Sequence, residues 1–425
     1  MDDSIVSYYT ATAQPAPSTT SLGGEHRTQV AIVGGGFTGL GAARELARAG
    51  VPCAVLEAET LGFGASGRNG GQAHVGMRRD QIWLERVVGK ADARRLWDMA
   101  LEAYADVRRV ISDDTIACDF TPGHLHLDHK PQFVAETHAY VRHLNEVYDY
   151  PHIRCVGRDE ARALVDCSGY YGGALDAEGG HLHPLNLTLG LAHAAQSAGA
   201  ALFTHSRATQ LTRSGGGWRV ETAGGVVIAD QVILGGDGTL NGLNKTLDAH
   251  VMPINNFIAV TAPLPPAQLS ALIADKRAVS DSRFVVYYFR PTADNRLLFG
   301  GGENYSYTFP KGIAAFVRPH IARIFPAMRD VPIDYAWGGA LGITANRMPY
   351  VREVAPGVIT AAGYSGLGVI LAPYFGKILA QSIIGNRRDF EQLVKLPAMR
   401  FPGGRALRWP TMVAAMSIFA LRDRL

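Results

Sequence analysis

Hydrophobic residues near the start of the chain follow two spacings, and each spacing predicts one kind of element. After Gln29, residues 30–33 form a continuous apolar run, which is typical of a parallel strand buried on both faces. Apolar positions in 40–49 recur at helical spacing up to Gly50, and 53–56 form a second apolar strand that ends at Glu57. Together they predict one βαβ unit of about 30 residues.

The pattern changes along the chain and then returns, which favours two interleaved domains. Residues 77–171 alternate helical stretches with short strand-like pieces, whereas the α/β pattern returns in 193–236. Residues 250–335 are rich in β-forming residues and turns. The other elements expected are helices at 91–110, 132–147, near 193 and at 369–384, and strands at 219–221, 226–228, 231–234, 284–289, 296–299 and 358–360.

The expected fold is therefore α/β (α+β overall), with a Rossmann-like domain around a central parallel sheet and a second domain with a large mixed or antiparallel sheet. The ranges expected for the first domain are 28–76, 155–243 and 336–400, those for the second are 77–154 and 244–335, and 1–27 and 401–425 form terminal segments. Residues 409–420 are apolar with basic residues on both sides, which favours a docked helix or subunit contact over a membrane surface.

Composition excludes several classes of protein. The chain has 425 residues, of which 47% are hydrophobic and 19% charged, as expected for a large globular core without extensive disorder. The 41 Lys and Arg residues nearly balance 38 Asp and Glu residues, which gives no electrostatic case for nucleic acid. Four scattered cysteines, no secretory leader and no apolar run of about 18 residues indicate a soluble cytoplasmic protein with no metal site and no transmembrane segment.

The turn after the first strand carries a dinucleotide fingerprint. Gly34, Gly36 and Gly39 have the spacing Gly-x-Gly-x-x-Gly between a strand and a helix, and Glu57 follows 18 residues after Gly39. Glycines allow a tight turn, close approach of the backbone to a pyrophosphate, and close packing of helix and strand. The helix N-terminus offers N–H groups to the phosphates, and Glu57 can accept hydrogen bonds from ribose hydroxyls.

Two further glycine-rich stretches favour a flavin over a nicotinamide. Residues 61–72 hold five glycines directly after the βαβ unit, which suits backbone that runs along an extended ligand. We expect Ser66 and Arg68 to meet phosphates or the ribityl chain, and Asn69, Gly71 and Gln72 to reach a ring system. Residues 361–368 lead into a helix whose N–H groups would stabilise the negative charge of a reduced flavin.

Long motifs along nearly the whole chain resemble the glycine/D-amino-acid oxidase superfamily of FAD enzymes. The stretches that carry the resemblance are 7–9, 62–72, 179–184, 292–298, 363–366, 401–405 and 421–425. It implies an FAD enzyme that oxidises an amine carbon–nitrogen bond, with hydride transfer to the flavin, hydrolysis of the imine and reduction of O2 to H2O2. The stretches 62–72 and 338–340 contain no His, so we expect non-covalent FAD. Many relatives have His where this chain has Leu367, which leaves the substrate open.

By the same resemblance, Ala208 would lie near the adenine, and the strand end at 235–237 would pass the ribose and phosphates. The residues expected to contact FAD are Gly34, Gly36, Phe37, Thr38, Gly39, Glu57, Ala58, Gly64, Ala65, Ser66, Arg68, Asn69, Gly70, Gly71, Gln72, Ala208, Gly235, Gly236, Asp237, Gly363, Tyr364, Gly366, Leu367, Gly368 and Val369.

Few residues suggest a catalytic role. Amine oxidation needs little more than a dry pocket and a group that removes a proton from the amine. The candidates are His183 as a proton acceptor, Arg347 as a partner for a substrate carboxylate, Gln72 near the ring system, and Trp337, Tyr364, Tyr287 and Tyr288 as pocket walls. Each has a structural alternative: a residue that packs before Pro184 for His183, an ion pair for Arg347, and core packing for the aromatic residues.

The function that the resemblance implies is oxidation of a gamma-glutamylated diamine, or of a related small-molecule amine or amino acid, in polyamine catabolism. O2 is the expected electron acceptor. Two alternatives remain open: a dehydrogenase that passes electrons to a quinone or carrier protein, and a flavin-binding redox sensor without turnover. The sequence gives no indication of the oligomeric state.

Overall fold

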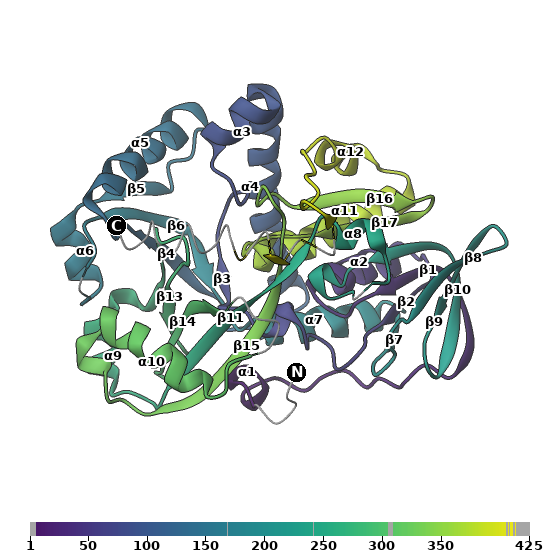
Figure 1. Cartoon of the computed structure of the whole chain (residues 1–425), viewed down its shortest axis with the longest axis horizontal. Helices are drawn as coiled ribbons and strands as arrows, with labels where there is room; N and C mark the ends of the chain where they lie inside the picture. The colour runs from purple at the N-terminus through teal and green to yellow at the C-terminus, as the bar shows by residue number, and fades with distance from the viewer. Residues whose placement is uncertain are drawn as a thin grey trace.

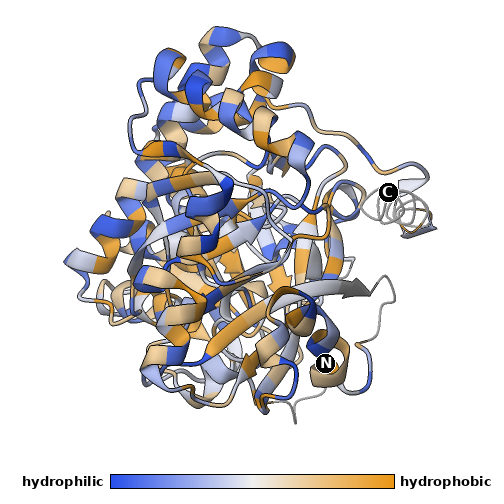
Figure 2. Ribbon diagram, turned by 90° about the vertical axis from the view of Figure 1, so that its left-hand side faces the viewer, coloured by the Kyte–Doolittle hydropathy of each residue, from blue (hydrophilic) through white to orange (hydrophobic). Residues whose placement is uncertain are grey.

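The computed structural model describes residues 6–167, 169–240, 242–304, 309–404, 407, 409, 410 and 413. Two β-sheets lie side by side, with helices packed around them (Figure 1). Hydrophobic positions concentrate on the central strands and inner helices, whereas the outer helices alternate hydrophilic and hydrophobic positions (Figure 2). Most of the apolar stretch 409–420 lies outside the described residues, so its expected role stays a prediction.

The first sheet is the parallel sheet that the βαβ pattern predicts. Its central strands β17, β10, β1, β2 and β7 are all parallel, and β16 and β9 pair with them in the antiparallel direction. Its strands are β1 (Gly24–Val33), β2 (Cys53–Leu56), β7 (Ala201–Phe203), β8 (Gln210–Ser214), β9 (Gly217–Glu221), β10 (Gly225–Leu234), β16 (Tyr350–Ala355) and β17 (Val358–Ala362). The four residues of β2 are all buried, as a strand covered on both faces requires.

The second sheet is mixed, with the order β15-β11-β14-β13-β12-β4-β6-β3 and β5 beside β6. Only the pair β12 and β4 is parallel among the described strands of this sheet. Its strands are β3 (Gln72–Ala73), β4 (Thr121–Leu127), β5 (Ile153–Val156), β6 (Gly173–His181), β11 (Met252–Thr261), β12 (Ala278–Asp281), β13 (Tyr288–Pro291), β14 (Leu297–Asn304) and β15 (Ile333–Ile343).

The helices divide between the two sheets. Those that run along the first sheet include α2 and α11, while α5, α6, α9 and α10 lie around the second (Figure 1). The helices are α1 (Tyr8–Ala11), α2 (Phe37–Arg48), α3 (Gln81–Val88), α4 (Lys90–Asp113), α5 (Pro131–Val147), α6 (Arg158–Leu164), α7 (Pro184–Ser197), α8 (Lys245–Asp248), α9 (Pro266–Leu272), α10 (Ile313–Ile324), α11 (Gly368–Ile384) and α12 (Arg388–Val394). In the described part of the chain no single helix is long and apolar enough to cross a bilayer, and α11 with α12 qualifies only as a pair bent by 119°.

The expected fold class is confirmed, whereas some element boundaries differ. The strands expected at 226–228 and 231–234 are one strand, β10, because β1 pairs alongside almost its whole length. The strand expected at 284–289 begins only at Tyr288, because Asp281 accepts hydrogen bonds from the backbone N–H groups of Arg283 and Tyr287 and closes a loop there. Helix α7 begins at Pro184, with the His183 side chain accepting a bond from the backbone N–H of Asn186.

The division into domains remains a prediction. Strands β3 and β6 come from segments that we assigned to the first domain, and both pair in the second sheet. Strand β1 begins at Gly24, inside the segment assigned as an N-terminal extension. That segment also packs into the molecule, because Tyr8 and Tyr9 of α1 are buried.

Helices α2 and α11 cross with their backbones in contact, and glycines make this contact possible. A Cβ atom at Gly41 would lie 2.4 Å from the carbonyl oxygen of Pro373. A Cβ atom at Gly376 would lie 2.1 Å from the carbonyl oxygen of Thr38. The crossing fixes the start of α2 against α11, and both helices begin at the cavity described below.

Replacement of Gly376 by Ala tests this contact. Alanine alone would raise helix stability by about 1 kcal/mol, but its Cβ would collide with Thr38. We therefore expect Gly376→Ala to lower the free energy of unfolding by about 1–3 kcal/mol, measured by denaturant unfolding. Gly157→Ala is the control, because a Cβ there meets nothing within 4 Å. A Gly376→Ala protein as stable as the parent would contradict the crossing.

Candidate active site

The turn between β1 and α2 leaves no room for side chains. Gly34 has a φ of +111°, and a Cβ atom there would lie 2.9 Å from the backbone of Gly235. A Cβ atom at Gly39 would lie 1.9 Å from the carbonyl oxygen of Gly34. The first turn of α2 therefore starts directly at the carboxyl edge of the parallel sheet, where its N–H groups can meet an anion.

Ser66 covers the start of α2 from the neighbouring loop. The backbone N–H of Phe37 donates to the Oγ atom of Ser66 over 2.9 Å. A Cβ atom at Gly36 would lie 2.7 Å from the same Oγ atom. Gly36 and Ser66 thus form a cradle that any larger residue at position 36 would fill.

Glu57 closes the second strand of the βαβ unit. Its Oε2 atom accepts from the N–H of Gly35 over 2.7 Å, and its Oε1 atom accepts from the N–H of Glu59 over 3.0 Å. Burial raises the pKa of Glu57 above its ordinary value, and these backbone hydrogen bonds act in the opposite direction. Each oxygen keeps a further lone pair, so the carboxylate can still accept from a ribose hydroxyl.

The loop at 61–72 is held by its own polar side chains. Asn69 donates through Nδ2 to the carbonyl oxygens of Ala65 and Ser66, both over 2.9 Å, and accepts through Oδ1 from the N–H of Gly71 over 2.7 Å. Arg68 donates to the carbonyl oxygen of Phe63 over 2.8 Å. Both side chains also line the cavity described below, so the expectation that they meet the ligand stays a prediction.

Asp237 joins three strand ends beneath the cavity. Its two carboxylate oxygens accept from the N–H groups of Gly363 over 2.6 Å and Gly342 over 2.7 Å. Burial raises the pKa of Asp237, and these backbone hydrogen bonds oppose the shift. Tyr364 comes directly after Gly363 in the chain, and its hydroxyl lies 2.7 Å from the Oγ1 atom of Thr38. These contacts set the start of α11 beside the start of α2.

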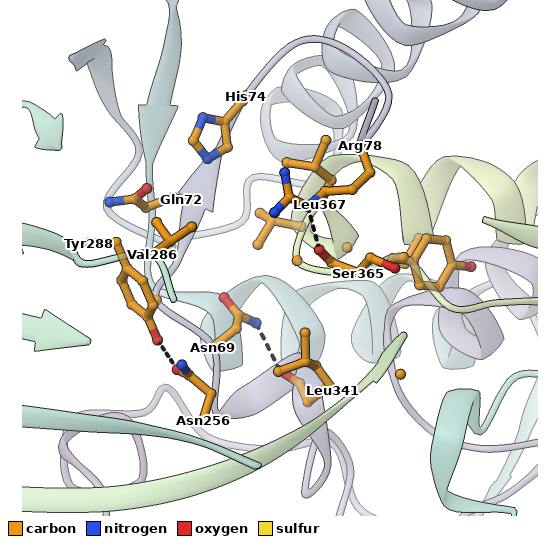
Figure 3. A pocket seen from close by; sticks show the side chains of 18 of the residues that line it. Asn69, Gln72, His74, Arg78, Asn256, Val286, Tyr288, Leu341, Ser365 and Leu367 are labelled. Carbon is orange, nitrogen blue, oxygen red and sulfur yellow. Dashed lines mark hydrogen bonds between the residues drawn. The ribbon is translucent and has the colours of Figure 1, made fainter. Parts of the chain in front are cut away.

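These segments border one cavity of about 450 Å³, lined by elements of both sheets (Figure 3). The expected site residues that line it are Phe37, Thr38, Ala65, Ser66, Arg68, Asn69, Gly70, Gln72, Gly235, Asp237, Arg347, Tyr364, Gly366, Leu367, Gly368 and Val369. The expected site residues outside its lining are Gly34, Gly36, Gly39, Glu57, Ala58, Gly64, Gly71, His183, Ala208, Gly236, Trp337 and Gly363. The structure therefore brings together three stretches that lie up to about 330 residues apart in sequence.

Comparison with known proteins identifies the family. Residues 29–382 match the family described as FAD dependent oxidoreductase. The chain belongs to this family. It is 40% identical to probable oxidoreductase OrdL of Rhizobium meliloti, over 98% of this chain and 97% of that protein. It is 35% identical to gamma-glutamylputrescine oxidoreductase of Escherichia coli over the full length of both.

A solved structure supports the same fold. The crystal structure of glycine oxidase from Geobacillus kaustophilus superposes with a TM-score of 0.70 at 21% identity, over 84% of this chain and 94% of that chain.

The predicted cofactor, FAD, is confirmed by the family match. The residues present fit this group: the cradle at Gly36 admits only a backbone, and α11 begins without a side-chain cap. When bound, FAD supplies the hydride acceptor of an FAD-dependent oxidoreductase.

Two expected catalytic residues lie behind the cavity wall. His183 is buried, and its ring nitrogens contact the N–H of Asn186 over 3.1 Å and the Oγ1 atom of Thr12 over 3.1 Å. Trp337 is fully buried and donates through Nε1 to the carbonyl oxygen of Arg68 over 3.1 Å. A role for His183 as proton acceptor therefore has no support from the geometry, and Trp337 braces the loop at 61–72 instead.

Among the expected wall residues, Tyr364 and Tyr288 line the cavity and Tyr287 does not. Gln72 also lines it, but its Nε2 atom donates to the carbonyl oxygen of Val279 over 2.8 Å. The polar lining residues that were not among the expected site residues are His74, Arg78, His124, His126, Asn256, Ser280, Asp281 and Ser365. For one of them a signal was present: His74 lies two positions after Gln72 and directly after β3, and alternate residues of a strand face the same side.

Two histidines of the cavity lining are uncharged. Burial is the main cause that lowers the pKa of His74 to about 4 and that lowers the pKa of His124 well below its usual value. Both imidazoles are therefore neutral at physiological pH. The part of the chain that the structure describes contains no cluster of three His, Cys, Asp or Glu side chains that could hold a metal ion.

Gly36→Val tests the cofactor cradle. The new side chain would displace Ser66 and fill the space at the start of α2, so we expect FAD affinity to fall at least about 100-fold. The measurement is a fluorescence titration of the FAD-free protein with FAD, with circular dichroism to verify the fold. Gly23→Val is the control, because a Cβ there meets nothing within 4 Å. A folded Gly36→Val protein that binds FAD like the parent would refute the assignment.

Proposed function

We propose that this FAD-dependent oxidoreductase oxidises the primary amine of gamma-glutamylputrescine or of a close analogue, in polyamine catabolism. The carbon that bears the amine loses a hydride and the nitrogen loses a proton, which gives an imine. Water then converts the imine to an aldehyde and ammonia. Two electrons and two protons reduce O2 to H2O2. FAD is bound without a covalent link in this proposal.

The observation that carries the proposal is the 35% identity to gamma-glutamylputrescine oxidoreductase across both whole chains. A likeness over the entire length includes the second sheet, which supplies part of the cavity lining. Strands β4, β11, β12 and β13 all contribute lining residues there. The four cysteines are unpaired, which supports a reducing compartment such as the cytoplasm.

The cavity suits an amine with a distal acidic head. An amine has an ordinary pKa of about 10.4, and a dry pocket lowers that value and favours the uncharged form that can release hydride. Phe284, Val286 and Tyr288 supply apolar surface. Arg347 lines the same cavity, with its guanidinium 4.8 Å from the centre of the Phe284 ring. We assign Arg347 to the substrate carboxylate, which a guanidinium can hold through two hydrogen bonds.

Anaerobic bleaching of the flavin tests the function. The FAD-loaded protein is mixed without O2 with gamma-glutamylputrescine, putrescine, glycine and L-proline, and the visible flavin absorbance is followed. We expect rapid bleaching with gamma-glutamylputrescine, and one H2O2 per turnover after O2 is admitted. If another compound of this panel bleaches the flavin and gamma-glutamylputrescine does not, the proposed substrate is wrong and that compound takes its place.

The same experiment separates the two alternative functions. Fast bleaching with slow return of colour in O2, but fast return with a quinone, would favour a dehydrogenase. A flavin spectrum that none of the four compounds changes would favour a redox sensor. The proposed function requires both half-reactions, so either result would overturn it.

Arg347→Met tests the assignment of the carboxylate partner. We expect kcat/KM for gamma-glutamylputrescine to fall about 10- to 100-fold, because a charged hydrogen-bond pair is lost. Any rate with putrescine, which has no carboxylate, should stay within about 2-fold. The control is Arg154→Met, because Arg154 is exposed and pairs with Glu160 at the surface. Equal losses with both amines would indicate that Arg347 supports the cavity rather than the carboxylate.

A further inference from the structure

The part of the cavity lined from β3 and β4 contains two adjacent histidines, His74 and His124, which we call the imidazole pair. His74 follows β3, and His124 lies on β4, two strands away across β6. Their ring centres are 4.0 Å apart with the planes at 77°, so one ring meets the other edge to face. Both residues line the cavity.

His124 is the fixed member of the pair. It is buried, and its Nε2 atom lies 2.9 Å from the Oγ atom of Ser280 on β12. Strands β4 and β12 pair in parallel at this point, with Ser280 opposite His126. Ser280 therefore anchors His124, and His124 in turn supports one side of the His74 ring.

His74 is the member that faces the open space. Figure 3 shows its ring projecting into the cavity, with Gln72 on one side and Arg78 on the other. Within the described ranges, neither ring nitrogen of His74 has a hydrogen-bond partner in the protein, although the ring packs against His124. A polar group that loses water without a partner costs free energy, so a ligand that satisfies this nitrogen gains affinity.

The surroundings define which ligand group fits. A neutral imidazole offers one nitrogen lone pair, which accepts a hydrogen bond from an N–H or O–H donor. Asp281 also lines the cavity, but its oxygens already receive the Tyr170 hydroxyl over 2.9 Å and the N–H of Tyr287 over 2.9 Å, and Arg283 forms an ion pair with it. Among the described lining residues, His74 is thus an open acceptor and Asp281 is an occupied one.

We propose that His74 binds the reacting nitrogen of the substrate, which donates an amine N–H to the ring, with His124 and Ser280 fixing the orientation of that ring. This assignment rests on the proposed amine oxidation. It explains how the cavity holds an amine although the carboxylate of Asp281, which also lines it, already has other donors. A neutral acceptor binds the uncharged amine well, and this is the form from which hydride leaves.

The test replaces His74 in the full-length, FAD-loaded protein. His74→Leu removes the acceptor, and His74→Gln keeps an amide oxygen that can accept in its place. The measurement is the rate of anaerobic flavin bleaching against the concentration of gamma-glutamylputrescine. FAD stoichiometry and the unfolding temperature verify that each variant is intact.

We expect His74→Leu to lower the second-order rate constant of bleaching at least about 10-fold, mainly through weaker amine binding. His74→Gln should recover most of that loss, which a purely structural role would not allow. His152→Leu is the matched control, because His152 is half exposed at the surface and pairs only loosely with Glu178.

The outcomes distinguish this inference from the proposed function. If the parent protein bleaches and His74→Leu bleaches equally fast, the inference is wrong and the function stands. Equal losses in His74→Leu and His74→Gln would also overturn it, because the acceptor atom would not matter. If the parent does not bleach with gamma-glutamylputrescine, the proposed function fails and this assignment fails with it.

Discussion

Close contact between backbones is the constraint on which the rest of the site depends. The turn after β1 touches the end of β10, and α2 touches α11, at points where even a methyl group would collide. No side chain separates these elements, so the first turns of α2 and α11 are fixed relative to each other to within the tolerance of van der Waals contact. Two helix N-termini thereby reach one cavity, as an anionic cofactor requires.

The two sheets contribute different kinds of groups to the cavity. The first sheet supplies turns and strand ends of glycine and small residues, which let a large cofactor approach the backbone. The second sheet supplies side chains, among them His124, Ser280 and Tyr288, from three neighbouring strands. Asp237 connects the two parts, because it holds Gly342 at the end of β15 and Gly363 after β17. Cofactor position and substrate pocket are thus set by one framework.

The sequence was sufficient to predict what depends on short-range pattern. The βαβ unit, its glycine turn and the helix after residue 363 follow from local spacing, because a parallel strand and a phosphate turn impose strong local requirements. The direction of individual side chains was not predictable. Asn69 donates to carbonyl oxygens of its own loop, and Arg68 donates both to that loop and to the carbonyl oxygen of Gly338 on β15.

The imidazole pair was beyond sequence reasoning for a different reason. His74, His124 and Ser280 are spread over about 200 residues, and only the strand order β3-β6-β4-β12 brings them together. Strand order in a mixed sheet depends on long-range pairing, which leaves no local signature. His183 shows the limit of motif reasoning in another way, since the motif suggested a proton acceptor, whereas the side chain accepts a hydrogen bond at the start of α7 and its catalytic role stays a prediction.

Arg290 shows why the N-terminal segment belongs to the active-site framework. This buried guanidinium donates to the carbonyl oxygens of Gly70 over 2.8 Å and Leu182 over 3.0 Å and to the Tyr9 hydroxyl over 3.0 Å. Its partners in the described part of the chain include no carboxylate, so backbone and hydroxyl oxygens and the Nδ1 atom of His181 compensate its charge. Loss of any one of them would leave a buried charge poorly solvated. The loop at Gly70, strand end Leu182 and helix α1 are therefore held as one unit, and the cavity wall is as rigid as that unit.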